Sequence, residues 1–160
     1  MTRPRVRGFS IIELLVVLAV LGILASVALP LSEVVQTRKK EEQLRRSLWE
    51  LRDAVDSYKR AVDDGRIIPR PSVSGYPPSL DVLVEGVAVS GTRGGSERIY
   101  FLRRIPTDPL APDPSLPVKA QWGLRSYASP SDRPEAGDDV YDVYSRSTLT
   151  GLNGIAYREW

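Results

Sequence analysis

One carboxylate, Glu13, stands at the start of an apolar run that continues to Leu31 and is otherwise long enough to cross a lipid bilayer. A charged group at the edge of such a run costs a few kcal/mol on insertion scales, so it is a candidate functional residue that needs a partner. The short segment before it ends at Gly8 and contains three arginines and no acidic residue. Cleavage after Gly8 would free an α-amino group on Phe9. That group would lie about one helical turn from Glu13 in the same chain, or beside Glu13 of a neighbouring chain.

This combination resembles the class III leader peptide of type IV pilins and pseudopilins. The matching features are a basic leader ending in Gly8, the aromatic Phe9, then Glu13, then an apolar helix that contains Gly22 and Pro30. The resemblance implies that a membrane-embedded prepilin peptidase cuts after Gly8 and methylates the new amino terminus of Phe9. It also implies that Glu13 helps each subunit to dock into a helical filament, and that the helix unwinds between Gly22 and Pro30 on assembly.

Two other interpretations of the same segment compete with this one. In the first, the segment is a secretory signal peptide cut after Ser26-Val27-Ala28, which would release a periplasmic protein that begins at Leu29. A glutamate at the start of the apolar region is poorly tolerated there, and the helical pattern continues past Pro30. In the second, the segment is a plain single-span anchor, which leaves Gly8 and Glu13 unexplained.

Composition restricts the possible functions of the rest of the chain. The 160 residues suit one small domain plus an anchor, and the net charge is +2. Removal of the three leader arginines from the 22 basic residues leaves 19 basic residues against 20 acidic ones. We therefore expect no basic surface of the kind that binds nucleic acids. Cysteine and histidine are both absent, which excludes disulfides, the usual zinc sites and Cys-His or Ser-His-Asp catalysis. We therefore predict a protein that is not an enzyme.

Charge alone does not assign the topology of the span. Basic residues flank both ends, so the positive-inside rule does not favour a cytoplasmic amino terminus. The resemblance, in contrast, implies that the leader is cytoplasmic and that the carboxy-terminal domain lies in the periplasm, anchored in the inner membrane. The basic residues in question are Arg3, Arg5 and Arg7 on one side, and Arg38, Lys39, Lys40, Arg45 and Arg46 on the other.

The helix is predicted to continue beyond the span, through residues 32–65. Apolar residues recur there at alternating spacings of four and three, which places them on one face. They are Leu44, Leu48, Leu51, Val55, Tyr58 and Val62. The solvated side is predicted to carry Glu41, Glu42, Arg45, Arg46, Glu50, Arg52, Asp53 and Lys59. Gly65 suits a left-handed helix cap, so one helix from about Ser10 to Asp64 is expected, interrupted or bent near Gly22 and Pro30.

Residues 66–160 are predicted to form the globular part of the chain. A short helix over 79–84 should end at Gly86, and Gly91 to Ser96 should form a loop tip. Strands are expected at 122–128 and at 139–145, the second with the two-residue period of a sheet, joined through a hairpin connection at 132–138. The predicted fold class is therefore α+β and type IV pilin-like. Its long amino-terminal helix, membrane-spanning in the first half, packs on a small antiparallel sheet.

Three further segments narrow the resemblance to the major pseudopilins (protein G) of type II secretion. They are Gly75 to Leu83, Ile105 to Pro109 and Asp142 to Ser145. This resemblance implies a structural subunit of a periplasmic pseudopilus that helps to drive folded proteins across the outer membrane. The implied partners are other copies of the chain, minor pseudopilins, the prepilin peptidase and an inner-membrane assembly platform. A type IV pilin of a surface filament is the alternative.

One departure from this family concerns calcium. The family's last loop usually carries two aspartates that help to bind calcium, whereas residues 146–154 of this chain contain no carboxylate. We therefore expect no cofactor, and calcium binding that is weak or absent. Asp138, Asp139 and Asp142 are predicted to be solvated turn and edge-strand charges. The loop is predicted to be held by apolar packing of Leu149, Leu152, Tyr157 and Trp160.

Overall fold

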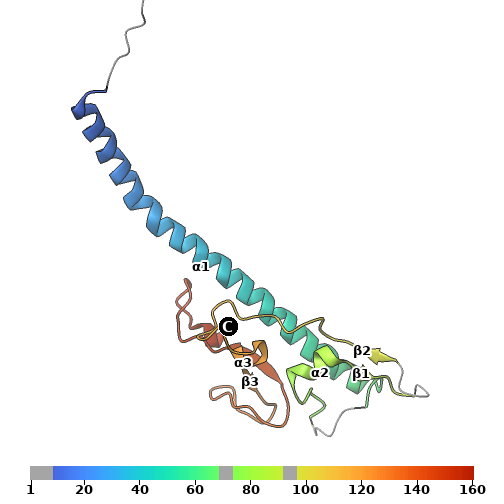
Figure 1. Cartoon of the computed structure of the whole chain (residues 1–160). Helices are drawn as coiled ribbons and strands as arrows, with labels where there is room; N and C mark the ends of the chain where they lie inside the picture. The colour runs from blue at the N-terminus through green and yellow to red at the C-terminus, as the bar shows by residue number, and fades with distance from the viewer. Residues whose placement is uncertain (1–8, 69–73, 92–96) are drawn as a thin grey trace, which may run out of the picture. The chain divides into compact units, whose positions relative to one another are not determined.

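Figure 1 shows the computed structural model of the chain, which describes residues 9–68, 74–91 and 97–160, with the backbone alone at 27–30. The structure divides into two compact units, Met1–Lys39 and Lys40–Trp160, and each is described by itself. The predicted leader 1–8, the prolines Pro69 and Pro71 and residues 92–96 of the predicted loop tip lie outside the described residues.

Helix α1 (Ile11–Asp63) is the longest element, with 53 residues, and its bounds agree with the predicted helix to within one residue. Gly65 follows its end and forms the predicted left-handed cap, with a φ of 68°. The N–H of Gly65 donates to the carbonyl of Val62, and that of Arg66 donates to Ala61, both at 2.9 Å. These bonds satisfy carbonyls that the end of a helix otherwise leaves without donors.

One face of α1 carries the core of the second unit, as the spacing predicted. Leu44, Leu51 and Tyr58 are fully buried, Leu48 and Val55 almost so, and Val62 is half-buried at the edge. Removal of this apolar surface from water is the main stabilising term of a domain of this size. The buried residues that complete the cluster from the rest of the domain are Ile67, Leu80, Val82, Leu83, Val87, Leu102, Trp122, Val140, Val143 and Tyr157.

The segment after α1 forms a short helix and a small ladder. Helix α2 (Leu80–Glu85) begins after Ser79 and ends at Gly86, close to the predicted bounds. Strand β1 (Val87–Ala88) then pairs antiparallel with β2 (Arg98–Ile99), and an isolated bridge joins Ile67 to Val89. This ladder was not predicted, because strands of two residues are too short to show a period.

The carboxy-terminal part contains the second ladder. After α3 (Val118–Gln121), strand β3 (Trp122–Arg125) pairs antiparallel with β4 (Asp142–Ser145), and η1 (Tyr157–Glu159) follows. Gly123 lies opposite Tyr144, where an added Cβ would come within 2.2 Å of the tyrosine ring. The α+β fold class is therefore confirmed, although the described residues form two separate two-stranded sheets where a single sheet was predicted.

Both predicted strands were right in position and too long. The N–H of Ser126 donates to the carbonyl of Glu135, and that of Val140 donates to Pro77, so neither continues the ladder. Val140 and Val143 are both buried, which is incompatible with the predicted alternation through residues 139–145. The alternation holds only from Asp142, where the strand begins.

Candidate assembly site

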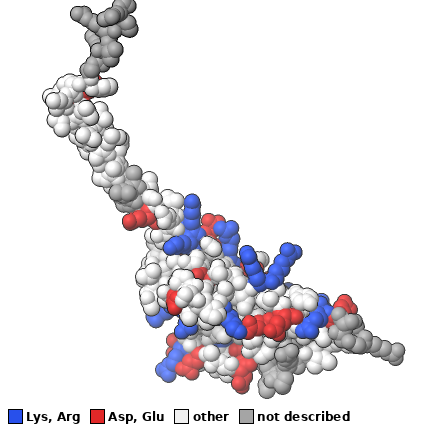
Figure 2. Space-filling model, in the orientation of Figure 1, with Lys and Arg blue, Asp and Glu red and all other residues white. Residues whose placement is uncertain are grey.

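The first half of α1 carries an apolar surface that no other part of the described chain covers. Every large apolar side chain from Phe9 to Leu24 is exposed, including Ile11 at 81%. Figure 2 shows this segment with very few charged atoms. By length and composition α1 qualifies as a membrane-crossing helix, although a signal sequence near an amino terminus meets the same criterion. A helix that is apolar on all sides belongs in lipid or against other chains.

Glu13 lies in the first turn of α1, where unpaired backbone N–H groups favour a negative charge. This turn is closed by the N–H of Leu14, which donates to the carbonyl of Ser10 at 3.1 Å, and Phe9 precedes the helix. The Glu13 side chain is exposed, and none of the ion pairs among the described residues includes it. Its carboxylate is therefore accessible from outside the chain. Gly8 lies outside the described residues.

Gly22 and Pro30 both lie inside α1. A Cβ added at Gly22 would meet no atom within 4 Å, so packing inside this chain does not require the glycine. Pro30 has no N–H, which leaves the carbonyl of Ser26 without its helical donor. The helix nevertheless continues through both positions, so the predicted interruption is absent from the single chain. Unwinding on assembly stays a prediction.

A buried carboxylate on α1 organises the last loop of the domain. Glu41 is 8% exposed, and its Oε1 accepts hydrogen bonds from the N–H of Leu152 at 2.6 Å and from the hydroxyl of Tyr157 at 3.0 Å. We call these two bonds the Glu41 latch. Burial, together with the hydrogen bond to Glu41, raises the pKa of Tyr157 from 10 to about 12. The latch was not predicted, since Glu41 was assigned to the solvated side.

The latch requires a close backbone approach at Gly151. A Cβ added there would lie 2.6 Å from the Trp160 ring and 3.1 Å from Oε1 of Glu41. The loop is closed further by Asn153, whose side-chain oxygen accepts from the N–H of Ile155 at 3.0 Å. The last loop is therefore fixed to α1 by polar contacts with its backbone.

The predicted apolar packing of this loop is only partly right. Tyr157 is buried and Trp160 is half-buried, whereas Leu149 is 61% exposed and Leu152 is 50% exposed. The latch turns the backbone N–H of Leu152 toward α1, and the Leu152 side chain remains outside the core. The prediction is wrong for both leucines.

The three aspartates upstream of the loop differ in their surroundings. Asp138 is exposed as predicted, but Asp139 is buried, where it accepts from the N–H of Tyr127 at 2.8 Å and bonds to the Ser74 hydroxyl. Asp142 pairs with Arg52, so the prediction of solvated charges is wrong for these two. Within the described residues no three acidic side chains lie close enough to hold a metal ion. Calcium binding itself stays a prediction.

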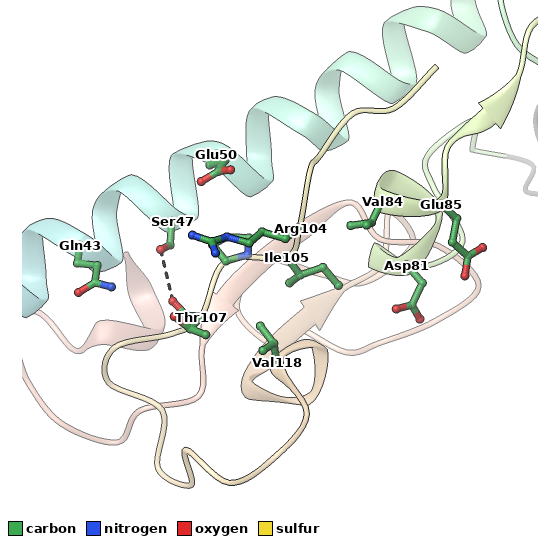
Figure 3. Close-up of a pocket in the computed structure, with 11 residues that line it drawn as sticks. Gln43, Ser47, Glu50, Asp81, Val84, Glu85, Arg104, Ile105, Thr107 and Val118 are labelled. Carbon is green, nitrogen blue, oxygen red and sulfur yellow. Dashed lines mark hydrogen bonds between the residues drawn. The ribbon is translucent and has the colours of Figure 1, made fainter. Parts of the chain in front are cut away.

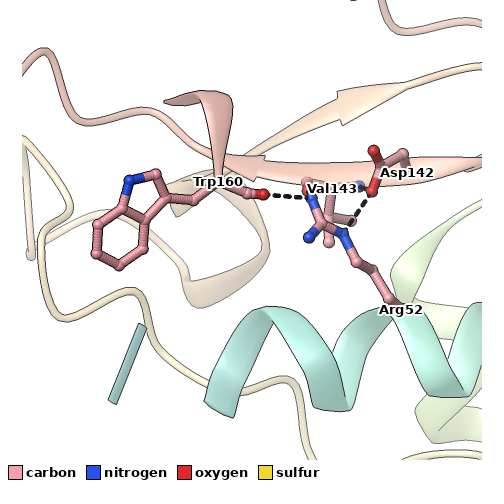
Figure 4. Close-up of polar contacts among 4 residues, drawn as sticks. All are labelled: Arg52, Asp142, Val143 and Trp160. Atoms are coloured by element: carbon pink, nitrogen blue, oxygen red, sulfur yellow. Dashed lines mark hydrogen bonds and ion pairs between the residues drawn. The ribbon is translucent and has the colours of Figure 1, made fainter. Parts of the chain in front are cut away.

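Arg52 joins α1 to the second ladder and to the last residue (Figure 4). Its Nε donates to Oδ1 of Asp142 at 2.8 Å, and its Nη2 donates to the carbonyls of Val143 at 3.1 Å and Trp160 at 2.9 Å. The guanidinium thus uses its fixed fork of donors on three acceptors at once. Arg52 was predicted to be solvated, and it is half-buried instead.

The segment from Ile105 to Pro109 supports the fold. Asp108 is buried, and its carboxylate accepts from the hydroxyl of Ser145 at 2.7 Å and from the N–H of Leu110 at 2.8 Å. The neighbouring carbonyl of Pro106 accepts from the indole N–H of Trp122 at 2.8 Å. Figure 3 shows the open hollow beside this segment, where Ser47 on α1 bonds to the carbonyl of Thr107 at 3.4 Å.

Comparisons with known proteins agree with these features. The family model described as the prokaryotic N-terminal methylation motif matches residues 3–29. The type II secretion system core protein G of Klebsiella pneumoniae is 29% identical over 141 residues, covering 85% of this chain and 93% of that protein. The core protein G of Dickeya chrysanthemi is 26% identical over 94% of this chain and 95% of its own length. No solved structure gives a significant match.

The chain resembles the type IV pilin-like proteins. Its likeness to the type II secretion core protein G extends over both units of the chain. The type IV major pilin protein PilA of Myxococcus xanthus is 42% identical, but over 55 residues only, which cover 34% of this chain and 25% of that pilin. The resemblance inferred from the motifs is therefore confirmed.

Two polar residues that organise this pilin-like chain were assigned to the wrong face. Glu41 lies three residues before Leu44 and so continues the spacing of the buried stripe, a signal that the sequence carries. Its charge nevertheless led to the prediction of a solvated residue, because acidic residues are rarely buried unless they have partners. No comparable signal marks Arg52, whose partners are 90 or more residues away.

Proposed function

We propose that this chain is a structural pseudopilin, the repeating subunit of a type II secretion pseudopilus that helps to move folded proteins across the outer membrane. The observation that carries the proposal is the joint occurrence of the methylation motif and of similarity to protein G over most of the chain. The proposed role is mechanical and not catalytic, as for a structural subunit of a filament.

Before assembly the subunit is stored in the inner membrane, with its leader in the cytoplasm and residues 66–160 in the periplasm. The exposed apolar surface of α1 supports this storage state, since residues 9–31 have the length that a bilayer requires. Residues 32–65 continue the helix into the domain. The prepilin peptidase cuts between Gly8 and Phe9 and methylates the new amino group.

Assembly then transfers α1 from lipid to a bundle of neighbouring helices. Glu13 pairs there with the amino group of Phe9 on another copy, because an unpaired carboxylate is costly among apolar helices. The segment from Gly22 to Pro30 unwinds at this step, since Pro30 already lacks one helical hydrogen bond. Minor pseudopilins and the inner-membrane assembly platform act as the further partners.

The amino terminus of the mature protein tests this proposal. Mass spectrometry of the full chain, extracted from membranes of cells that contain a prepilin peptidase, should give a chain that begins at methylated Phe9. A terminus at Leu29 would establish a signal peptide, and an intact Met1 would leave a plain anchor. In a host that lacks its own copy of the gene, the chain should restore secretion of folded proteins.

A type IV pilin of a surface filament is the second candidate, and the PilA similarity over 55 residues favours it. Both candidates share the processing step, so the terminus does not separate them. Electron microscopy of intact cells does, because a pilin yields long surface filaments and leaves secretion unchanged. A pseudopilin shows the reverse at its natural expression level.

A further inference from the structure

Within the second unit, α1 carries an exposed tryptophan beside an apolar groove. The side chain of Trp49 is 72% exposed, which is unusual for a residue type that is mostly buried on average. Trp49 lines a groove of about 400 Å³ together with Arg45, Ile155 and Trp160. The guanidinium of Arg45 lies 4.5 Å from the centre of the Trp160 ring, so these residues form one continuous surface. We call these four residues the Trp49 groove.

This groove is open in the single chain and offers one unpaired charge. Ile155 is 47% exposed, and Figure 4 shows the indole of Trp160 extending away from the contacts of Arg52. The other charged residues of the lining, Arg52 and Glu159, each have an ion-pair partner inside the chain. None of the ion pairs among the described residues includes Arg45. Apolar surface rimmed by a free charge marks an interaction site.

A second aromatic surface lies on the loop between β3 and β4. Tyr127 is 61% exposed, and the centre of its ring lies 5.8 Å from that of Tyr76 and 5.5 Å from that of Tyr141. Cations of the same chain lie over two of these rings, Lys59 over Tyr76 at 5.9 Å and Arg125 over Tyr141 at 5.2 Å. Among the described residues no such cation lies over Tyr127. Its ring therefore has room for a cation that a partner supplies.

Two exposed carboxylates flank Tyr127. The N–H of Ser126 donates to the carbonyl of Glu135 at 2.9 Å, and the N–H of Tyr127 donates to the carboxylate of Asp139 at 2.8 Å. These bonds hold Glu135 and Asp138, which precedes Asp139, close to the tyrosine. Both are exposed, and neither belongs to an ion pair among the described residues. We call Tyr127, Glu135 and Asp138 the Tyr127 surface.

The two surfaces are separate parts of the same domain and differ in charge. One hollow lies between them, because its lining includes Trp160 of the groove and Arg125, whose guanidinium lies over the tyrosine cluster. Residues 132–138 contain three acidic residues and one arginine, whereas the unpaired charge of the groove is that of Arg45. Each surface thus has the charge that the other would attract.

We propose that the Tyr127 surface of one copy binds the Trp49 groove of the next copy, head to tail, in the assembled filament. The ring of Tyr127 enters the groove, and Glu135 and Asp138 lie against Arg45. Tryptophan, tyrosine and arginine carry most of the binding energy of protein interfaces, and such residues face one another across them. Because the two surfaces differ, each copy can contact two neighbours, which extends a filament where the rotation closes no ring. The inference rests on the filament of the proposed function.

The test is cross-linking between copies, because the chain has no cysteine of its own. The full chain with Ile155→Cys and Ala128→Cys, produced in a host that lacks its own copy of the gene, should give a ladder of multimers with a short bis-maleimide. Each single variant should give none. Ile155→Cys with Leu116→Cys is the matched control, since Leu116 is also exposed on this domain. Adding Tyr127→Ala should abolish the ladder, whereas Tyr100→Ala, which removes a tyrosine that is 62% exposed, should leave it.

Reversal of the charges tests the pairing without removing an aromatic ring. Arg45→Glu alone should abolish the ladder, and so should Glu135→Arg with Asp138→Arg. The three changes together should restore it, because the attraction is then re-formed with opposite signs. Arg66→Glu is the control, since Arg66 is exposed and belongs to no ion pair among the described residues. Thermal melts of each variant in micelles show that the domain is still folded.

Three results would overturn the inference. They are the absence of a ladder, a cross-linked dimer that does not extend, which would assign the two surfaces to a closed pair, and folded charge variants whose combination restores nothing. Secretion is measured separately in the same cells. A parent chain that does not restore secretion contradicts the proposed function, whereas a cysteine variant that restores secretion without a ladder contradicts this inference alone.

Discussion

The two halves of α1 differ in the exposure of their apolar side chains, although they belong to one helix. From Phe9 to Leu24 the large apolar side chains are all exposed, whereas from Leu44 to Tyr58 those on the 4-3 spacing are buried against the domain. The second half therefore packs its apolar face against the rest of its unit, whereas the described part of the first half packs against nothing within the chain. A single chain thus covers the apolar surface of α1 only within the unit that begins at Lys40. Under the proposed function, the surface before it contacts lipid and then other copies of the chain.

The largest expected effect concerns Glu13, which should be needed for assembly and for nothing inside the subunit. Glu13→Ala should leave membrane insertion and processing intact and should abolish filaments and secretion, because a neighbour's amino group loses its counter-charge. Filaments are counted by electron microscopy after the variant replaces the parent gene. Glu33→Ala, which removes the carboxylate beyond the other end of the apolar run, should still assemble. Normal filaments from Glu13→Ala would refute the docking role.

The second prediction concerns the half of α1 that packs on the domain. Leu51→Ala should lower the free energy of unfolding by about 2–5 kcal/mol, since a fully buried leucine leaves a cavity. Leu18→Ala, in the exposed half, should change the same free energy by less than about 0.5 kcal/mol. Denaturant titration of both variants in detergent micelles measures this. Similar losses would mean that the first half is also packed inside the subunit.

The Glu41 latch should contribute a smaller amount. Glu41→Ala leaves the N–H of Leu152 and the hydroxyl of Tyr157 without their acceptor, which should cost about 1–3 kcal/mol. Glu42→Ala is the matched control, because Glu42 is exposed on the next position of the helix. Hydrogen exchange at the amide of Leu152 should accelerate in the first variant alone. Unchanged exchange there would contradict the latch.

Alkaline pH should reveal the same latch through Tyr157. The folded chain keeps the phenol proton until its pKa of about 12, whereas the unfolded chain loses it near 10. The stabilisation is therefore complete below pH 10 and declines as the pH rises toward 12. Tyr157→Phe should cost about 1 kcal/mol at neutral pH and should reduce the decline. A parent and variant with parallel profiles from pH 9 to 12 would show that Tyr157 does not titrate in this way.

The smallest expected effect is that of calcium. The last loop has no carboxylate of its own, and Glu41 already serves two donors. Thermal melts of the full chain in micelles, with calcium and with a chelator, should therefore coincide. A rise of several degrees at micromolar free calcium would show that carbonyl oxygens of residues 148–153 and nearby acids hold the ion after all.

The long helix and its buried face could be predicted from the sequence, because their periodicity extends over many residues. The bounds of α1, the buried stripe from Leu44 to Tyr58 and the cap at Gly65 all follow from spacing and backbone chemistry. The pairing of β3 with β4 was also predicted, from one alternating segment and a turn. Short elements such as β1 and β2 carry too few residues for a pattern.

The polar contacts of the domain were predicted least well. Glu41, Arg52 and Asp139 were all assigned to solvent, because a charged residue is usually exposed when its partner is unknown. Each has partners far along the chain, and Leu152 is 111 residues from Glu41. Contacts at that separation depend on the tertiary fold of the domain, which the local spacing of residues does not indicate.

The position of the Glu41 latch has a mechanical consequence. When α1 is pulled along its axis, the force reaches the folded domain at residues 40 and 41. The Glu41 latch and the first buried leucine therefore bear the load before the rest of the core does. The loop bonds to Glu41 through the backbone N–H of Leu152 and the hydroxyl of Tyr157 on η1. Tension on a growing filament would thus be shared between the helix and the end of the chain. The helix α1 would therefore not separate from the domain one turn at a time.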